Sequence, residues 1–467
     1  MAKPKLDSEQ RSKILRVIVW SLLLDLISFT FILPLFPKLL EFYRDREAPS
    51  LLLKDASEKT LLQMVLGGLN TYKAYFSRPI DSRYDIILLG GAMGSLFSLL
   101  QAVASPTIGR LSDKYGRRKA LLASMVGNIL SVLLWVAAVD FRTFIASRVV
   151  GGLSEGNVQL ATAMASDISD SKSRGSTMAM VGVCFSVAFT IGPALGAWLS
   201  TISTFSANPF ATAAGFSLAL LVIETVFLYR ELPETLPSMI EIKSKKEDEK
   251  ENGEEKPEPE SRVVERSNSF VLLNGVHFVF LLFFSGMETS LTFLCYDLFA
   301  FTPAKNGKLL GFVGLMAALF QGSFTRRMRP LVSIRIGVGA CLAAFILLAR
   351  ISSVGGLYLA AFFLAMTSAT VVTSLNALTS FEAKTTERGS KLGDLRSWGQ
   401  LGRGLGPILF TSVYWWAGRE YAYNMGAVGI LALFVVVLVG LKPPKLTETE
   451  KLEEASSKVK VPVQKKD

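Results

Sequence analysis

The feature that most constrains this chain is a series of long apolar blocks that recurs along all 467 residues. Each block is about 20 residues long, which is the length a helix needs to cross the hydrocarbon core of a bilayer. The blocks are continuously apolar, whereas the strands of a membrane barrel alternate between apolar and polar residues. Helices also satisfy every backbone polar group inside lipid. The sequence therefore predicts an all-α membrane protein.

We expect twelve transmembrane helices in two pseudo-symmetric six-helix lobes. The predicted spans of the N-terminal lobe are 14–40, 85–108, 119–139, 143–166, 175–201 and 210–229. The predicted spans of the C-terminal lobe are 269–297, 307–325, 331–349, 354–378, 395–416 and 421–441. The expected boundaries are a cytosolic N-terminus at 1–13, a first lobe at 14–229 with a long outer loop at 41–84, a cytosolic linker at 230–268, a second lobe at 269–441 and a cytosolic tail at 442–467.

Basic residues predict the orientation in the membrane. Lys and Arg cluster in alternate connections, namely 109–118, 167–174, 230–268, 326–330 and 379–394. Because positively charged loops stay on the cytosolic side, we expect both termini in the cytosol, in a plasma membrane or an endomembrane. The same clusters account for the net charge of +11. We therefore expect the lipid bilayer as a partner, and we expect no nucleic acid. We expect a monomer.

Several segments are expected to differ from the spans. Residues 243–260 are dominated by Glu and Lys, so the middle of the linker is predicted to be disordered, as is the lysine-rich tail. In the outer loop, the leucine-rich stretch 61–69 predicts a short helix near the interface. The three cysteines (Cys184, Cys295 and Cys341) fall in apolar blocks and indicate buried side chains rather than a disulfide framework.

The two halves of the chain carry the same spacing of particular residues. Arg174 precedes the pair Gly192-Pro193 by 18 residues, and Arg388 precedes Gly406-Pro407 by the same 18. A duplicated six-helix unit joined by a soluble linker is typical of secondary transporters whose two lobes rock about a central site.

Ionisable side chains inside the predicted spans are the candidate functional residues, because a charge at membrane depth is costly unless it faces a partner or a polar cavity. The candidates for a substrate or proton site are Asp25, Arg148, Glu155, Glu288 and Arg403. We expect these side chains to line one central cavity. A desolvated carboxylate there could exchange a proton during transport. An arginine could hold an anionic substrate in a bidentate geometry that lysine cannot supply.

Other interpretations of the polar residues stay open. The charges could pair with each other and only lock helices together. Arg396 fits a structural position in the cytosolic headgroups, and His277, the single histidine, fits a buried core side chain better than a proton relay. The string Gly152-Leu153-Ser154-Glu155-Gly156 matches a serine-hydrolase pattern, but that pattern requires a strand-to-helix turn. The sequence shows no metal-ligand cluster and no nucleotide motif, so we expect no enzyme, no metal and no cofactor.

A basic loop between the second and third spans has the sequence Gly109-Arg110-Leu111-Ser112-Asp113-Lys114-Tyr115-Gly116-Arg117-Arg118-Lys119. It resembles the signature loop of the major facilitator superfamily of transporters. With Leu24-Asp25 and Ile191-Gly192-Pro193-Ala194-Leu195-Gly196, the chain is similar to the twelve-span drug:proton antiporter branch, which includes tetracycline exporters.

The resemblance implies roles for two further groups of residues. One is a cytosolic latch in which Arg117 reaches Asp167. Its expected members are Gly109, Asp113, Gly116, Arg117, Arg118, Asp167 and Arg174. The other is a gate between the lobes, expected at Gly192, Pro193, Gly196, Gly406 and Pro407.

The charged residues and the resemblance together predict a proton-coupled secondary transporter that works by alternating access. Its expected substrate is a small organic anion or a drug-like amphiphile. Two alternatives remain at this stage: a membrane scaffold or receptor that kept the transporter fold without transport, and a uniporter without proton coupling.

Overall fold

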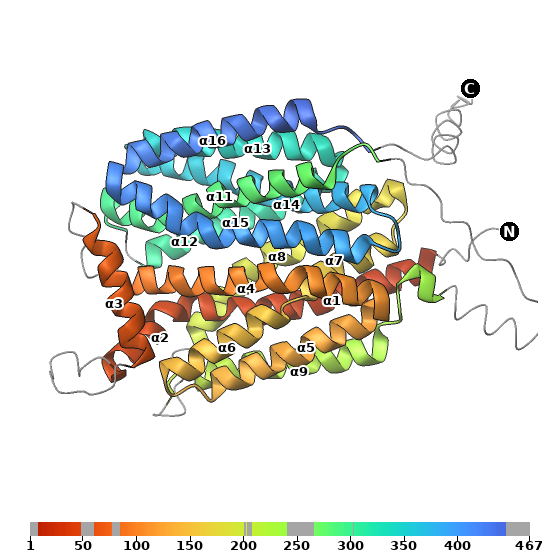
Figure 1. Cartoon of the computed structure of the whole chain (residues 1–467), viewed down its shortest axis with the longest axis horizontal. Coiled ribbons are helices and arrows are strands. Elements are labelled where there is room, and N and C mark those ends of the chain that lie inside the picture. The colour runs from red at the N-terminus through yellow and green to blue at the C-terminus, as the bar shows by residue number, and fades with distance from the viewer. Residues whose placement is uncertain are drawn as a thin grey trace, which may run out of the picture.

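The structure is a computed structural model that describes residues 8–47, 60–76, 85–199, 202, 208–240, 266–301 and 303–444. Within these residues the chain is helical and contains no β-strand. Figure 1 shows the long helices lying side by side in two bundles, with α4 and α15 in contact between them. The described part of the chain therefore has the predicted all-α architecture with two lobes.

The two lobes divide the chain near its middle. The N-terminal lobe consists of α1 (Ser8–Thr30), α2 (Ile32–Glu47), α4 (Asp85–Tyr115), α5 (Arg117–Val136), α6 (Phe141–Ser154), α7 (Asn157–Asp167), α8 (Ser171–Leu199) and α9 (Ala211–Glu231). The C-terminal lobe consists of α11 (Phe270–Phe299), α12 (Pro303–Leu319), the short turns η3 (Phe320–Phe324) and η4 (Thr325–Arg327), α13 (Pro330–Ala349), α14 (Val354–Glu382), α15 (Arg388–Ala417) and α16 (Arg419–Gly440).

Three of the predicted spans are not single α-helices. The span expected at 14–40 is two helices that meet at Phe31, where Pro34 has no N–H to donate to the carbonyl of residue 30. The span expected at 143–166 is interrupted between α6 and α7, and the span expected at 307–325 ends in a π turn followed by a 3₁₀ turn. Each interruption lies inside a predicted membrane crossing.

Hydropathy alone recovers only part of the architecture. Among the described residues, nine helices are long and apolar enough to cross a membrane. The remaining three crossings are α1–α2, α6–α7 and α15, and these hold the charged candidates Asp25, Arg148, Glu155 and Arg403. With them the described chain makes the twelve predicted crossings. The polar residues of the bundle are thus concentrated in the helices that look least like membrane spans.

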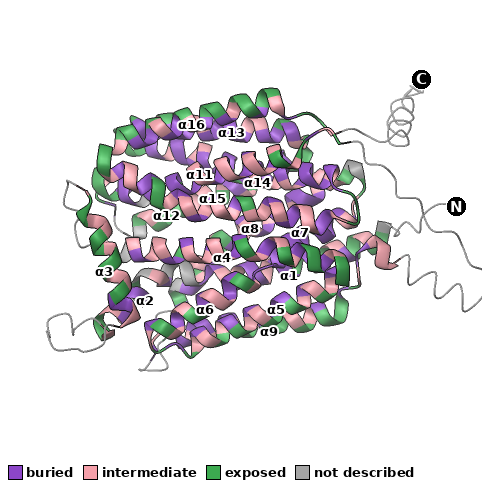
Figure 2. Ribbon diagram, in the orientation of Figure 1, coloured by how far each residue is buried: buried purple, intermediate pink, exposed green. Residues whose placement is uncertain are grey.

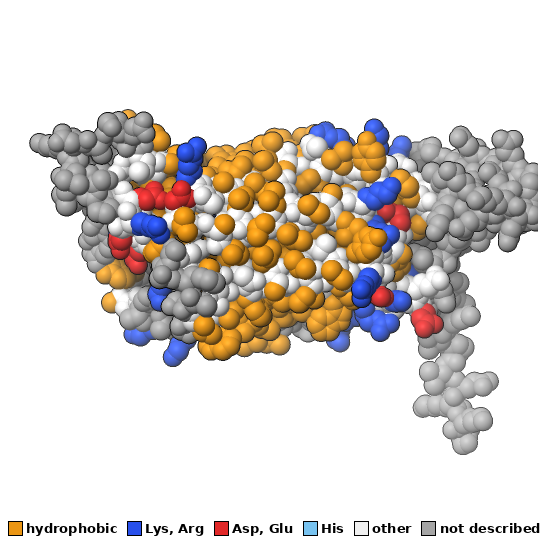
Figure 3. Space-filling view, turned by 90° about the horizontal axis from the view of Figure 1, so that it is seen from below, with side chains coloured by type: hydrophobic (Ala, Val, Ile, Leu, Met, Phe, Trp, Pro, Cys, Tyr) orange, Lys and Arg blue, Asp and Glu red, His pale blue; other side chains and the backbone are white. Residues whose placement is uncertain are grey.

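The surface has the pattern expected of a protein immersed in lipid. Figure 3 shows a broad band of hydrophobic side chains across the middle of one face of the molecule, with charged groups toward its two ends. Figure 2 shows that buried residues lie along the inner faces of the helices. Large apolar side chains such as Trp198, Val271 and Val439 are mostly exposed, which lipid, unlike water, accommodates without cost.

The two ends of the bundle differ. One end carries the turn between α4 and α5, and we call it the latch end; α1 begins there and α16 ends there (Figure 1). The opposite end carries α3 (Leu61–Ala74), the short helix predicted in the outer loop. Thr60 and Gln63 cap its start reciprocally, and Tyr72 bonds to Ser412 of α15 with 2.6 Å between the hydroxyl oxygens. The predicted disordered stretch 243–260 and most of the tail lie outside the described residues.

Candidate functional site

The fourth crossing breaks at membrane depth, and an acidic residue lies at the break. Helix α6 ends at Ser154, and Glu155 has φ −69° and ψ 85°, which is not helical. A Cβ on Gly156 would come within 2.7 Å of Ser124 Oγ and 2.8 Å of Ile108 Cγ2, so only glycine fits between α4 and α5. The prediction of a continuous helix here was wrong. Broken helices of this kind build ion and substrate sites in transporters.

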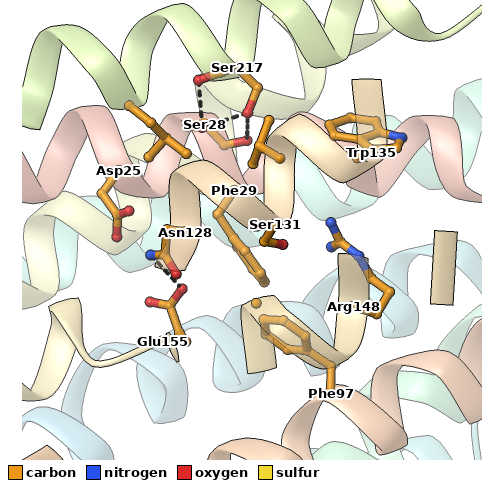
Figure 4. Close-up of a pocket in the computed structure, with 13 residues that line it drawn as sticks. Asp25, Ser28, Phe29, Phe97, Asn128, Ser131, Trp135, Arg148, Glu155 and Ser217 are labelled. Carbon is orange, nitrogen blue, oxygen red and sulfur yellow. Dashed lines mark hydrogen bonds between the residues drawn. The ribbon is translucent and has the colours of Figure 1, made fainter. Parts of the chain in front are cut away.

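A small cavity with both polar and apolar lining residues lies beside this break, in the N-terminal lobe (Figure 4). Its volume is about 40 Å³, which is room for a few water molecules. Its walls come from α1, α4, α5, α6, the break and α9. The lining residues are Asp25, Ser28, Phe29, Phe97, Asn128, Ser131, Val132, Trp135, Arg148, Gly151, Glu155, Ser217 and Leu221.

Two carboxyl groups share this cavity and act on each other electrostatically. Asp25 accepts a hydrogen bond from Asn157 Nδ2 at 2.8 Å, and Glu155 accepts one from Asn128 Nδ2 at 3.2 Å. Asp25 is 3% exposed and Glu155 is 8% exposed. Two like charges this close and this well buried are costly together. The pair is therefore suited to binding a proton.

Arg148 occupies the other side of the same cavity, where Glu155 is within its electrostatic reach. Among the described residues no carboxylate forms a direct ion pair with it. Its guanidinium carbon lies 5.8 Å from the ring centre of Phe97, 6.0 Å from that of Trp135 and 5.5 Å from that of Phe144. Its Nε donates to Ser147 Oγ at 3.3 Å. Aromatic faces stabilise a cation without consuming its N–H donors, so the remaining donors of Arg148 are available to an anion in the cavity.

Sequence reasoning missed one charged residue near this cavity and misplaced another. Glu224 of α9 is 1% exposed and acts on both Asp25 and Glu155. The signal for it was an acid in the middle of the largely apolar helix α9, whose other charged residues, Arg230 and Glu231, lie at its end. Arg396 of α15 is within electrostatic reach of the same two carboxyls. It therefore faces the N-terminal lobe, and the expected position among the headgroups was wrong.

The other two candidates lie apart from this cavity. Arg403 Nη2 lies 3.3 Å from Glu288 Oε2, and both side chains belong to the C-terminal lobe. The two side chains are 42% and 43% exposed. Arg403 shares a helix face with Arg396, two turns away, so it too points toward the N-terminal lobe. The structure thus brings together Asp25, Arg148 and Glu155 but places Glu288 and Arg403 in a separate ion pair.

The expected latch residues meet in an ionic network at the latch end, and it joins the two lobes. Arg117 contacts Asp113 at 2.7 Å and Asp167 at 2.9 Å, and its own side chain is fully buried. From the other lobe, Arg388 reaches Asp167 at 2.6 Å. Arg388 had been singled out only as the repeat of Arg174, so this role was not predicted.

Asp113 also caps a helix of the opposite lobe. Its carboxylate accepts from the backbone N–H groups of Gly389 at 2.9 Å and Ser390 at 2.6 Å, which belong to the first turn of α15. An acidic side chain at a helix N-terminus satisfies free N–H groups and complements the helix dipole. Closing the latch end therefore gains both an ion-pair network and a helix cap.

Three expected latch residues serve other contacts. Gly116 has φ +100°, which favours glycine, and it lets Glu234 accept from the N–H groups of Arg117 and Arg118. The Arg118 side chain donates to the carbonyl of Tyr229. Arg174 donates to the Ser380 carbonyl at 3.3 Å, which is a second contact between the lobes.

The expected gate glycines lie where helices approach closely. A Cβ on Gly192 would collide with Thr30 of α1, and one on Gly196 with the backbone of Phe31. Gly406 packs in the same way against Leu282 and Ser285 of α11. Pro193 and Pro407 lie inside the uninterrupted helices α8 and α15. Small residues at such crossings allow backbones of membrane helices to approach.

The single histidine and the three cysteines lie in buried positions. His277 is buried, and its Nδ1 lies 2.8 Å from the Leu395 carbonyl of α15. The three cysteines are free and buried. No cluster of metal-ligating side chains occurs in the part of the chain that the structure describes.

Comparison with known proteins identifies the family. A model of the Major Facilitator Superfamily matches residues 18–407. The chain belongs to the major facilitator superfamily. Major facilitator superfamily domain-containing protein 10 of Bos taurus is 32% identical over 464 residues, which are 95% of this chain and 97% of that protein. The resemblance inferred from the basic loop is therefore confirmed.

Two further relatives agree with this assignment. The crystal structure of the human organic anion transporter MFSD10 (TETRAN) matches with a TM-score of 0.79 and 31% identity, over 91% of this chain and 99% of that chain. The class G tetracycline resistance protein of Vibrio anguillarum is 27% identical over 375 residues, which are 76% of this chain and 88% of that protein.

Membership of the major facilitator superfamily settles the broad class of the protein. It is an integral multi-pass membrane protein of a transporter family, with lipid and a small-molecule substrate as its partners, and it is not an enzyme. The serine-hydrolase pattern at 152–156 accordingly lies at a helix break rather than at a strand-to-helix turn.

Proposed function

We propose that this protein is a proton-coupled transporter of small organic anions, working by alternating access. The observation that carries the proposal is the cavity in the N-terminal lobe, which is lined by Asp25 and Glu155 and by Arg148. Among the described residues, Arg148 forms no direct ion pair with a carboxylate. The pair of acids would bind the proton, and Arg148 would bind the anion. The human relative's name as an organic anion transporter supports the same substrate class.

We propose that different parts of the substrate bind at different places in the two lobes. The cavity of about 40 Å³ is too small for an organic molecule, but it can admit the carboxylate group of one. The half-exposed pair Glu288–Arg403 lies near the middle of its helices and on the face that points to the N-terminal lobe. We infer that the body of the substrate binds between the lobes, with its negative end toward Arg148.

The network at the latch end supports a conformation closed on that side. Asp113, Asp167 and Arg388 join the lobes there, and the basic loop favours a cytosolic position for this side. We propose that the described conformation is closed to the cytosol, and that the substrate enters or leaves on this side once Asp113 releases α15. Because α1 begins and α16 ends at the latch end, a cytosolic latch end also puts both termini in the cytosol.

Uptake into proteoliposomes tests the function. The labelled compound is p-aminohippurate, a small aromatic carboxylate. We expect it to accumulate in the liposomes when the pH gradient has one sign and not when it has the other. For a gradient of about one pH unit, the ratio of its internal to its external concentration should reach about tenfold per coupled proton. A protonophore should abolish the accumulation, and tetraethylammonium, an organic cation, should not accumulate.

Other outcomes separate the alternatives. Flux of p-aminohippurate that ignores the pH gradient would indicate a uniporter. If neither p-aminohippurate nor tetracycline enters faster than into protein-free liposomes, the result would favour a scaffold or receptor.

A further inference from the structure

Glu224 lies on the core-facing side of α9, next to the cavity but not in its wall. Ser217 and Leu221 line the cavity, and Glu224 continues the same buried face, followed by Leu228. Such spacing places all four side chains on one side of the helix. Glu224 is therefore the next polar group beyond the cavity along this face.

Its depth can be read from the pairing of α1 with α9. Ser28 and Ser217 are hydrogen-bonded with 2.5 Å between their hydroxyl oxygens, so they mark the same level (Figure 4). Asp25 is three residues toward the latch end from Ser28, and Glu224 is seven residues toward it from Ser217. At 1.5 Å per residue, Glu224 lies about 6 Å nearer the latch end than Asp25.

The surroundings of Glu224 are apolar. Its side chain is 1% exposed, and its neighbours Leu221 and Leu228 belong to an apolar cluster with Leu22 and Met125. Within the described chain, Oε2 of Glu224 has no hydrogen-bond partner. An ionised carboxylate in this position would cost far more than a neutral acid.

The charges that face Glu224 are acidic. Asp25 of α1 and Glu155 at the break between α6 and α7 both act on it electrostatically. The cations at the latch end of its neighbouring helices are engaged elsewhere. Arg117 of α5 pairs with Asp113 and Asp167, Arg118 donates to Tyr229, and Lys13 of α1 lies 3.6 Å from Glu231. None of them neutralises Glu224.

We propose that Glu224 is a second proton-binding site, which holds a proton while the latch end is closed and exchanges it with the cavity of Asp25 and Glu155. Three buried carboxyls lie within electrostatic reach of one another, and two guanidiniums, Arg148 and Arg396, act on them. A proton on one carboxyl would balance the charge. Among the described residues, Glu224 is the one of the three with no donor to its buried Oε2 and no cation acting on it. Its position on the latch side of Asp25 makes it the intermediate station between the cavity and the cytosol. This inference rests on the proposed proton coupling.

Infrared difference spectroscopy tests the proton directly. Purified protein in lipid is titrated with pH, and the carbonyl stretch of protonated carboxylic acids is followed in wild type and in Glu224→Gln. We expect the variant to lose one component of this band. The amide has nearly the same size as the neutral acid it replaces, so the melting temperature should not fall. An unchanged band would overturn the proposal.

Glu231→Gln is the matched control, because Glu231 lies two turns further along the same helix but pairs at the surface with Lys13. Its spectrum should equal that of the wild type. A second variant, Glu224→Leu, keeps the test decisive if glutamine disturbs folding, because a leucine there joins the apolar cluster and also removes the band.

A transport measurement distinguishes this inference from the proposed function. In Glu224→Gln, exchange of labelled p-aminohippurate at equal pH should stay within about twofold of wild type, while accumulation at a gradient of about one pH unit should fall by up to about tenfold. Full accumulation in the variant would exclude Glu224 from the coupling path. If the wild type itself shows no gradient-driven accumulation, the proposed function fails, and the infrared band still decides whether Glu224 holds a proton.

Discussion

Replacing Gly109 with valine is expected to reduce transport by about 100-fold. A Cβ at this position would lie 2.9 Å from the carbonyl carbon of Gly389 and 3.2 Å from the Cα of Ser390, so the backbones of α4 and α15 could not close. Overpacking of this kind costs about 3 kcal/mol at the upper end of the usual range. A cost of this size lowers the equilibrium population of the latch-closed conformation, relative to the open one, by about 100-fold.

Cysteine accessibility measures this effect apart from transport. Ser105 is fully buried near the contact of α4 with α15, so a Ser105→Cys reporter should react with a water-soluble maleimide only when the latch end opens. We expect labelling to rise when Gly109→Val is added. Gly91→Val is the matched control, since it lies on the same helix and a Cβ there meets nothing within 4 Å. Normal transport by Gly109→Val would show that close approach of these helices is not required.

Replacing Arg148 with lysine is expected to weaken binding of an organic anion by about 10- to 100-fold. Hydrogen bonds to a charged group contribute about 1.5 to 3 kcal/mol, and a lysine ammonium cannot supply the bidentate geometry of the guanidinium. It would also change the cation–π contacts of the guanidinium with Phe97, Trp135 and Phe144. The rate of p-aminohippurate exchange should fall in parallel with the affinity.

Equilibrium binding of labelled p-aminohippurate to purified protein checks the Arg148 prediction. The matched control is Arg142→Lys, because Arg142 lies on the same helix but is exposed, and its affinity should equal that of the wild type. Equal affinity in Arg148→Lys would remove Arg148 from the anion site. An effect on binding with no change in melting temperature would show that the loss is local.

The sequence predicts the fold well because its signals are local. Block length and loop charge give the crossings and their grouping into lobes, and the motif around Asp113 gives the family. The interruptions were not predicted. The break in the first crossing has a local cause in Pro34, but the break between α6 and α7 depends on contacts between helices. Gly156 looks like any small residue in a span until Ser124 and Ile108 are seen against it.

The site could be predicted only in part, because membrane-depth charge is visible in the sequence but helix rotation is not. Asp25, Arg148 and Glu155 were found by their cost in lipid, and the structure places them around one cavity. The same criterion could not tell that Glu288 and Arg403 pair elsewhere, or that Arg396 faces the N-terminal lobe. Those facts follow from which faces of α11, α15 and α1 meet.

The most direct test of the account compares Asp25→Asn with wild type in the same proteoliposomes. Asparagine keeps an oxygen that can accept the hydrogen bond from Asn157 but cannot bind the proton. The quantity measured is accumulation of p-aminohippurate under a pH gradient of about one unit, relative to its exchange at equal pH. We predict that Asp25→Asn exchanges at the wild-type rate and accumulates nothing, a loss of about tenfold per coupled proton. Wild-type accumulation by Asp25→Asn would contradict the account.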